Sequence, residues 1–212
     1  MAKEEKNIVE QATEEKKKLT FTDQMRVRFR GILDPIGAFL NRIGLMPNTM
    51  TILGLVGNTI GALLLSQGKM TYGGLIILAM GPVDALDGTM ARLRGEPSEF
   101  GAFVDSVTDR YSELVIFGGL LIYYVQQGDW TAALATYLAA SGSVLVSYVR
   151  ARASSLGYDT KVGILTRMER YLVLAPTLVL NIPLVGLWII AILANITALQ
   201  RIWDVRVQTR GK

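Results

Sequence analysis

The chain has 212 residues, 50% of them hydrophobic, with 22 Lys and Arg against 18 Asp and Glu and a formal net charge of +4. It contains no cysteine and no histidine, which excludes disulfides, thiolate chemistry and imidazole bases or ligands. The excess of basic residues has no interleaved aromatic-basic pattern, so we expect no nucleic-acid partner.

The first segment, residues 1–18, mixes both charges with little apolar content and is expected to be a disordered tail. Residues 19–43 differ, because apolar side chains recur there at helical spacing with arginines between them. This pattern predicts a juxtamembrane amphipathic helix. Such a helix lies either in the inner membrane interface or against the rest of the protein, and the sequence leaves both options open.

Six apolar runs follow, and each is long enough, or nearly so, to cross a bilayer as a helix. They cover residues 48–68, 72–92, 100–125, 130–153, 168–182 and 184–203. The sequence therefore predicts an all-α fold, an integral membrane bundle of six transmembrane helices. The membrane domain is expected at 44–205, followed by a cytoplasmic tail at 206–212. Frequent glycines within the runs indicate closely packed helices.

The connections at 67–69, 126–129 and 181–183 are short and would share one side of the membrane. Among the lysines and arginines, only Lys69 falls on that side. Because positively charged loops stay in the cytoplasm, we expect both termini to be cytoplasmic. The predicted location is the cell membrane, with the acidic residues described next at its cytoplasmic face.

Four aspartates interrupt the second and third apolar runs: Asp84, Asp87, Asp105 and Asp109. Their spacings of three and four residues place each pair on one helix face. Gly95 and Pro97 break the chain between the pairs, which predicts two antiparallel helices. The pairs lie about two turns on either side of that break, so they should meet at similar depth.

Four carboxylates that close together repel one another unless a cation compensates them. Oxygen ligands favour Mg²⁺, with Mn²⁺ and Ca²⁺ as alternatives, and one or two ions would balance the charge. A purely structural explanation pairs the aspartates with Arg92, Arg94 and Arg110 at the membrane edge.

The pattern Asp84-x2-Asp87-Gly88-x2-Ala91-Arg92-x8-Gly101-x3-Asp105-x3-Asp109 resembles the signature of the CDP-alcohol phosphotransferase family, with every motif position present. The resemblance extends to Pro47-Asn48-x2-Thr51 and to the six-helix plan, over roughly residues 45–205. It implies a metal-dependent enzyme that transfers a phosphoryl-alcohol group from a CDP-linked donor to a hydroxyl and releases CMP.

By the same resemblance, the four aspartates would hold two Mg²⁺ ions, with Mn²⁺ as an alternative, and Asp109 would be the general base. The implied CDP-binding residues are Asn48, Thr51, Asp87, Gly88, Ala91, Arg92 and Gly101. A homodimer is also implied.

A second basic cluster follows the fourth apolar run, where SYVRARA at 147–153 precedes KVGI at 161–164. Arginines bind phosphate in bidentate fashion, although inside-positive topology alone also explains the cluster. The stretch is similar to bacterial and archaeal family members that use inositol phosphate. Position by position, the similarity implies an acceptor-phosphate site, with Arg167 as a further candidate beside these residues: Ser147, Arg150, Arg152, Arg170 and Arg201.

The expected reaction therefore moves a phosphatidyl group from CDP-diacylglycerol, or its archaeal ether-lipid equivalent, to inositol phosphate. Glycerol 3-phosphate is the alternative acceptor, since it too carries a phosphate. A cation transporter is an alternative of another class, in which the aspartates would be ion sites.

Overall fold

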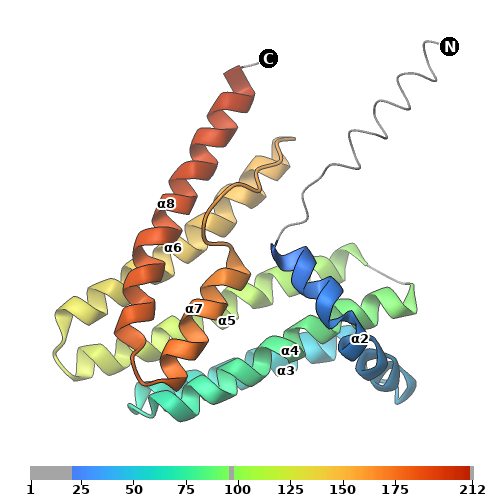
Figure 1. Cartoon of the computed structure of the whole chain (residues 1–212), viewed down its shortest axis with the longest axis horizontal. Helices are drawn as coiled ribbons and strands as arrows, with labels where there is room; N and C mark the ends of the chain where they lie inside the picture. Colours follow the sequence, from blue (N-terminus) through green and yellow to red (C-terminus); the bar gives the residue numbers. More distant parts are fainter. Residues whose placement is uncertain (1–20, 96–97, 211–212) are drawn as a thin grey trace.

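A computed structural model describes residues 21–95 and 98–210, with side chains from residue 28 onward. Within these residues the regular secondary structure is entirely helical, which confirms the all-α class (Figure 1). The segment 1–18 lies outside the described residues. The seven described helices are α2 (Phe21–Arg42), α3 (Pro47–Ser66), α4 (Met70–Arg94), α5 (Glu99–Gln126), α6 (Trp130–Ser155), α7 (Arg167–Val179) and α8 (Pro183–Arg210).

The helix ends follow from local sequence signals. α3 begins at Pro47, a residue whose missing N–H costs nothing in the first turn. α4 ends at Gly95, which adopts the left-handed conformation with φ of 69°. The side chain of Ser98 caps α5 by accepting from Gly101 N–H at 2.9 Å. The two aspartate-bearing helices are therefore separated at the break that the sequence predicts.

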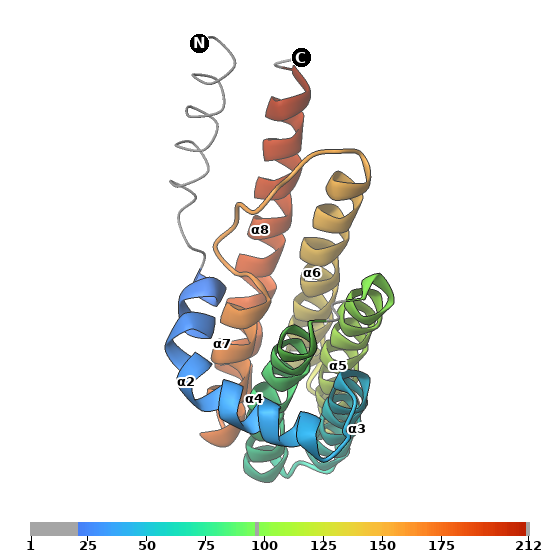
Figure 2. The same cartoon turned by 90° about the vertical axis from the view of Figure 1, so that its right-hand side faces the viewer.

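The helices α3, α4 and α5 form one half of the molecule, called here the acidic half because α4 and α5 carry the four aspartates. Within it α3 packs against both α4 and α5 (Figures 1 and 2). In the other half α6 packs along α8, while α5 joins the two halves through its contact with α6. α7 lies against α4 and α8. Burial of large apolar side chains such as Leu120, Leu178 and Ile190, none of which is exposed, stabilises this arrangement.

Glycines bring the helices of the acidic half close together. A Cβ on Gly73 would lie 2.8 Å from the carbonyl oxygen of Gly61, so α3 and α4 touch backbone to backbone at this point. Gly119 of α5 lies still more tightly against Ala62 of α3. Small residues at such contacts let membrane helices pack without large side chains between them.

α2 crosses α4 and contains Pro35 within its length (Figure 2). Leu33 and Leu40 pack on the small core around Met90, while Phe39 remains 62% exposed. Arg94 ties this helix to the end of α4, since its Nε donates to Asn41 Oδ1 at 2.7 Å. The predicted amphipathic helix therefore packs on protein with one face and leaves apolar side chains exposed on another.

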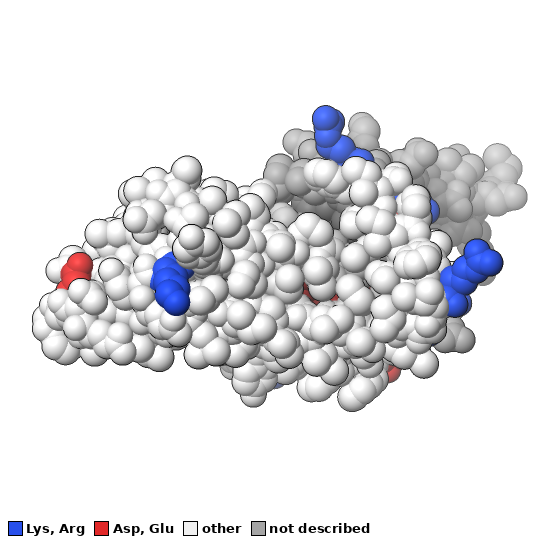
Figure 3. Space-filling model, turned by 90° about the horizontal axis from the view of Figure 1, so that it is seen from below, with Lys and Arg blue, Asp and Glu red and all other residues white. Residues whose placement is uncertain are grey.

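Much of the outer surface carries apolar side chains, and Figure 3 shows one face with only scattered charges. α3, α4, α6 and α8 are long and apolar enough to cross a membrane. The chain is thus built as a multi-pass membrane protein. α5 is long enough to cross a membrane, but its first half carries charged residues. α7 is shorter than the other described helices, with 13 residues. α8 continues to Arg210, so residues 206–210 extend that helix.

Candidate active site

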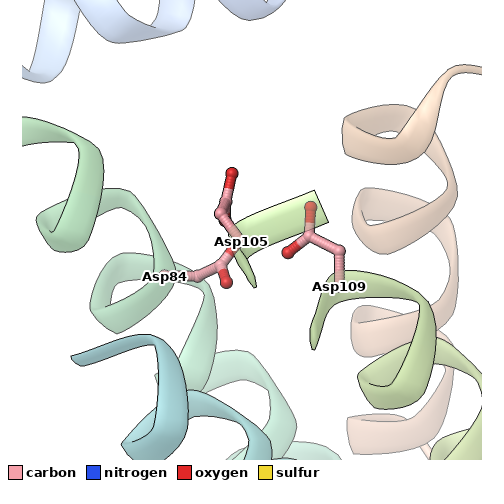
Figure 4. Close-up of side chains that lie close together, drawn as sticks. All are labelled: Asp84, Asp105 and Asp109. Carbon is pink, nitrogen blue, oxygen red and sulfur yellow. The ribbon is translucent and has the colours of Figure 1, made fainter. Parts of the chain in front are cut away.

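Three aspartates converge between α4 and α5. Asp84, Asp105 and Asp109 each offer a carboxylate oxygen, and these oxygens lie within 4.8 Å of one another. Figure 4 shows the three side chains pointing into a common space, one from α4 and two from α5. Asp109 is 6% exposed, and the other two are half-buried. The spacing along each helix and the packing of both helices on α3 produce this convergence.

Asp87 belongs to the same face of α4, but its carboxylate is held differently. Thr51 of α3 donates to Asp87 Oδ2 at 2.7 Å, and the N–H of Gly88 donates to Oδ1 at 2.5 Å. Asp87 is 7% exposed. The structure therefore groups three of the four predicted aspartates in one ligand set and places the fourth beside it, bonded to a residue of the predicted nucleotide site.

Arg167, the first residue of α7, bridges the acidic cluster. Its Nη2 lies 2.8 Å from Asp84 Oδ2 and 2.5 Å from Asp109 Oδ1. The sequence suggested this arginine only as a further candidate for acceptor phosphate. Its contact with the aspartates could not be read from local spacing, because it depends on how α7 packs against α4.

The residues expected to bind CDP come from α3, α4 and α5. Gly88 and Arg92 are exposed, and Arg92 donates to Thr89 Oγ1 at 3.0 Å. A Cβ on Gly101 would lie 3.8 Å from Asn48 Oδ1, so the starts of α3 and α5 meet there. Ala91 of α4 is half-buried. The motif thus gathers from three helices around the acidic cluster.

The predicted acceptor residues divide into two groups. Arg150 and Arg152 are exposed at the end of α6, whereas Arg170 and Arg201 are 2% and 3% exposed. Arg150 and Arg170 nevertheless both lie close enough to Arg201 for their charges to repel its charge. Ser147 Oγ donates to the carbonyl of Ser143 at 3.2 Å.

The buried arginines also have structural partners. Arg170 donates from Nε and Nη2 to Glu113 Oε1 at 2.9 and 2.7 Å. Arg201 donates to the carbonyls of Val162 and Val146, which ties the loop after α6 to that helix. Sequence reasoning missed Glu113, although an acidic residue one turn after Asp109 in an apolar helix is a signal that could have identified it.

This donor set suits a hard divalent cation. Three carboxylate oxygens from a rigid pair of helices match the all-oxygen preference of Mg²⁺ or Mn²⁺. Clustered carboxylates need such compensation, and Arg167 supplies one positive charge against three negative ones. The residues present therefore fit a metal ion.

Comparison with known proteins agrees with this chemistry. The CDP-alcohol phosphatidyltransferase family model matches residues 44–201. A phosphatidylinositol phosphate synthase of Streptomyces avermitilis is 36% identical over 198 residues, covering 85% of this chain and 80% of that protein. An archaetidylinositol phosphate synthase of Pyrococcus horikoshii is 32% identical over 184 residues, covering 86% of this chain and 95% of the relative.

Two crystal structures of the Mycobacterium tuberculosis phosphatidylinositol phosphate synthase share the fold at 33% identity. The form with CDP-DAG bound has a TM-score of 0.76 and covers 82% of this chain and 93% of that one. The complex with manganese and citrate has a TM-score of 0.77 and covers 82% and 88%. The family match extends over most of the membrane helices and includes every aspartate of the motif, so the chain belongs to the CDP-alcohol phosphatidyltransferase family.

Proposed function

We propose that this protein is a phosphatidylinositol phosphate synthase, which transfers a phosphatidyl group from CDP-diacylglycerol to inositol phosphate and releases CMP. The observation that carries the proposal is the convergence of Asp84, Asp105 and Asp109 from two helices. The relatives named for this activity support the choice of acceptor.

In this proposal Asp84, Asp105 and Asp109 hold divalent metal together with Asp87, and two Mg²⁺ ions are the resident cofactors. Bound metal would neutralise the charge that develops on the departing CMP phosphate. Asp109, a member of the cluster and largely buried, accepts the proton of the attacking hydroxyl.

The CDP group binds along the exposed face of α4. Gly88 and Ala91 leave room for the nucleotide, and Gly101 does so on α5, because their side chains are small or absent. Arg92 meets a phosphate, while Asn48 lies beside Gly101. Thr51 fixes Asp87 through its hydrogen bond, so that the carboxylate keeps one orientation.

The acceptor phosphate binds among the arginines at the cytoplasmic ends of α6, α7 and α8. Because Arg150 and Arg170 both repel the charge of Arg201, an anion beside Arg201 would be favoured. Arg152 and Ser147 complete this pocket from α6. Because Arg170 is held by Glu113, it would contribute mainly a fixed positive charge.

The membrane arrangement is part of the same proposal. Six helices, α3 to α8, span the bilayer, with both termini and the aspartates on the cytoplasmic side. α2 lies in the interface and presents exposed apolar residues, such as Phe39, to lipid. The functional unit is a homodimer. This placement lets a lipid tail remain in the bilayer while the cytidine lies in water.

The test is turnover by purified protein in mixed micelles with CDP-diacylglycerol, Mg²⁺ and one radiolabelled acceptor at a time. We expect inositol phosphate to give a labelled lipid and stoichiometric CMP, both abolished by a chelator and restored by Mg²⁺ or Mn²⁺. If only glycerol 3-phosphate gave a labelled lipid, the acceptor would be glycerol 3-phosphate and not inositol phosphate. A CDP-linked ether lipid, tried as donor in parallel, separates the bacterial from the archaeal reaction.

A further inference from the structure

We propose that Arg167 is a built-in counter-ion of the acidic cluster, which stabilises the metal-free protein and must be displaced when divalent metal binds. The inference rests on the proposed metal site and gives Arg167 a positioning role outside the CDP and acceptor pockets. It would set the metal concentration at which the enzyme becomes loaded.

One guanidinium nitrogen of Arg167 contacts two of the three clustered aspartates. Arg167 Nη2 contacts a carboxylate oxygen of Asp84 and another of Asp109 at 2.8 and 2.5 Å. Both aspartates belong to the group whose oxygens lie within 4.8 Å of one another. A divalent metal ion held by these aspartates would need the oxygens that Arg167 now contacts.

Guanidinium and metal therefore compete for these oxygens. An arginine N–H pointing at a metal ion also places two positive charges in contact, which is unfavourable wherever water is scarce. The side chain of Arg167 has room to leave, since it is 38% exposed. Arg170, one turn later on α7, lacks that freedom because it is 2% exposed and bonded to Glu113.

The same contact explains how the metal-free protein tolerates its carboxylates. Arg167 links the first turn of α7 to α4 and α5, so it both reduces repulsion between the aspartates and anchors that helix. Loss of this side chain should weaken the metal-free fold and leave the ligand oxygens free. Metal binding and metal-free stability should then change in opposite directions.

The experiment compares wild-type protein with Arg167→Gln, after chelation and removal of the chelator, in detergent and without substrates. Mn²⁺ binding is followed by the loss of its free electron paramagnetic resonance signal, and unfolding by tryptophan fluorescence. We expect Arg167→Gln to melt at a lower temperature without metal and to bind Mn²⁺ about tenfold more tightly, as for the loss of one partly buried ion pair.

Arg206→Gln is the matched control, because it removes one cation that stacks on Trp203 of α8 instead of contacting an aspartate. It should bind Mn²⁺ as the wild type does. Arg167→Lys keeps the positive charge but replaces the planar guanidinium by a compact ammonium group. Its affinity for Mn²⁺ should therefore lie between those of the wild type and Arg167→Gln. It replaces Arg167→Gln if that variant does not fold.

Equal or weaker Mn²⁺ binding by the Arg167 variants, with the wild type binding normally, would overturn the counter-ion role and show instead that Arg167 orients the ligands. A wild-type protein that binds no Mn²⁺ would refute the proposed metal site itself. If Arg206→Gln bound Mn²⁺ as tightly as Arg167→Gln does, the gain in affinity would come from the lower net charge of the protein. That result would also overturn the inference.

Discussion

Replacement of Glu113 by Gln is expected to lower the unfolding temperature markedly, because it leaves the Arg170 guanidinium buried without its carboxylate partner. Arg170 is 2% exposed and the Glu113 side chain 17%, and the pair shares two short hydrogen bonds to one oxygen. Removing one partner of a buried pair costs about 3–5 kcal/mol. Since glutamine keeps an acceptor oxygen, we take the lower value of about 3 kcal/mol.

For a chain of this length, each kcal/mol shifts the unfolding temperature by about 2–4 °C, so the expected decrease is roughly 6–12 °C. The assay is tryptophan fluorescence during heating in detergent micelles, without metal or substrate, so that no binding effect enters. Asp159→Asn is the matched control. Its partner Lys161 lies 3.1 Å away, but the two side chains are 63% and 43% exposed, and such pairs contribute at most about 1 kcal/mol.

If Glu113→Gln and Asp159→Asn melt at the same temperature, the buried pair contributes no more than an exposed one, and the reasoning from burial is refuted. A selective loss in Glu113→Gln would instead identify this glutamate as the residue that keeps Arg170 in place beneath the proposed acceptor pocket.

Three further changes test other parts of the structure. Asp105→Asn should abolish CMP release, since it removes a proposed metal ligand, and turnover above about one hundredth of the wild-type rate would contradict that role. Its unfolding temperature without metal should stay equal or rise, because repulsion between the carboxylates falls. Arg152→Ala should raise the KM for inositol phosphate several-fold more than the KM for CDP-diacylglycerol, and parallel increases would argue against separate pockets. Gly119→Ala should destabilise the fold by about 1–3 kcal/mol, because the new methyl group would collide with the carbonyl oxygen of Ala62, and a thermal scan that matches the wild type would exclude that close contact.

The sequence predicted the helical framework closely. Ser66, Met70 and Trp130 bound helices at the short polar connections that the apolar runs indicated. The break after α4 was also predicted, at Gly95, because helix ends depend on a few adjacent residues. α7 begins at Arg167, next to the predicted start at 168, but it ends at Val179, before the apolar run ends at 182, since Asn181 adopts a left-handed conformation just beyond it.

By itself the sequence determined which carboxylates share a helix face and that they interrupt apolar helices, because a spacing of three or four residues fixes direction on any helix. Only the tertiary structure decided which partners they meet. Thr51 turns Asp87 toward α3, and Arg167 reaches Asp84 and Asp109 from a helix far along the chain. Burial likewise separated Arg170 and Arg201 from the exposed arginines of α6, since accessibility depends on how distant helices pack and not on local order.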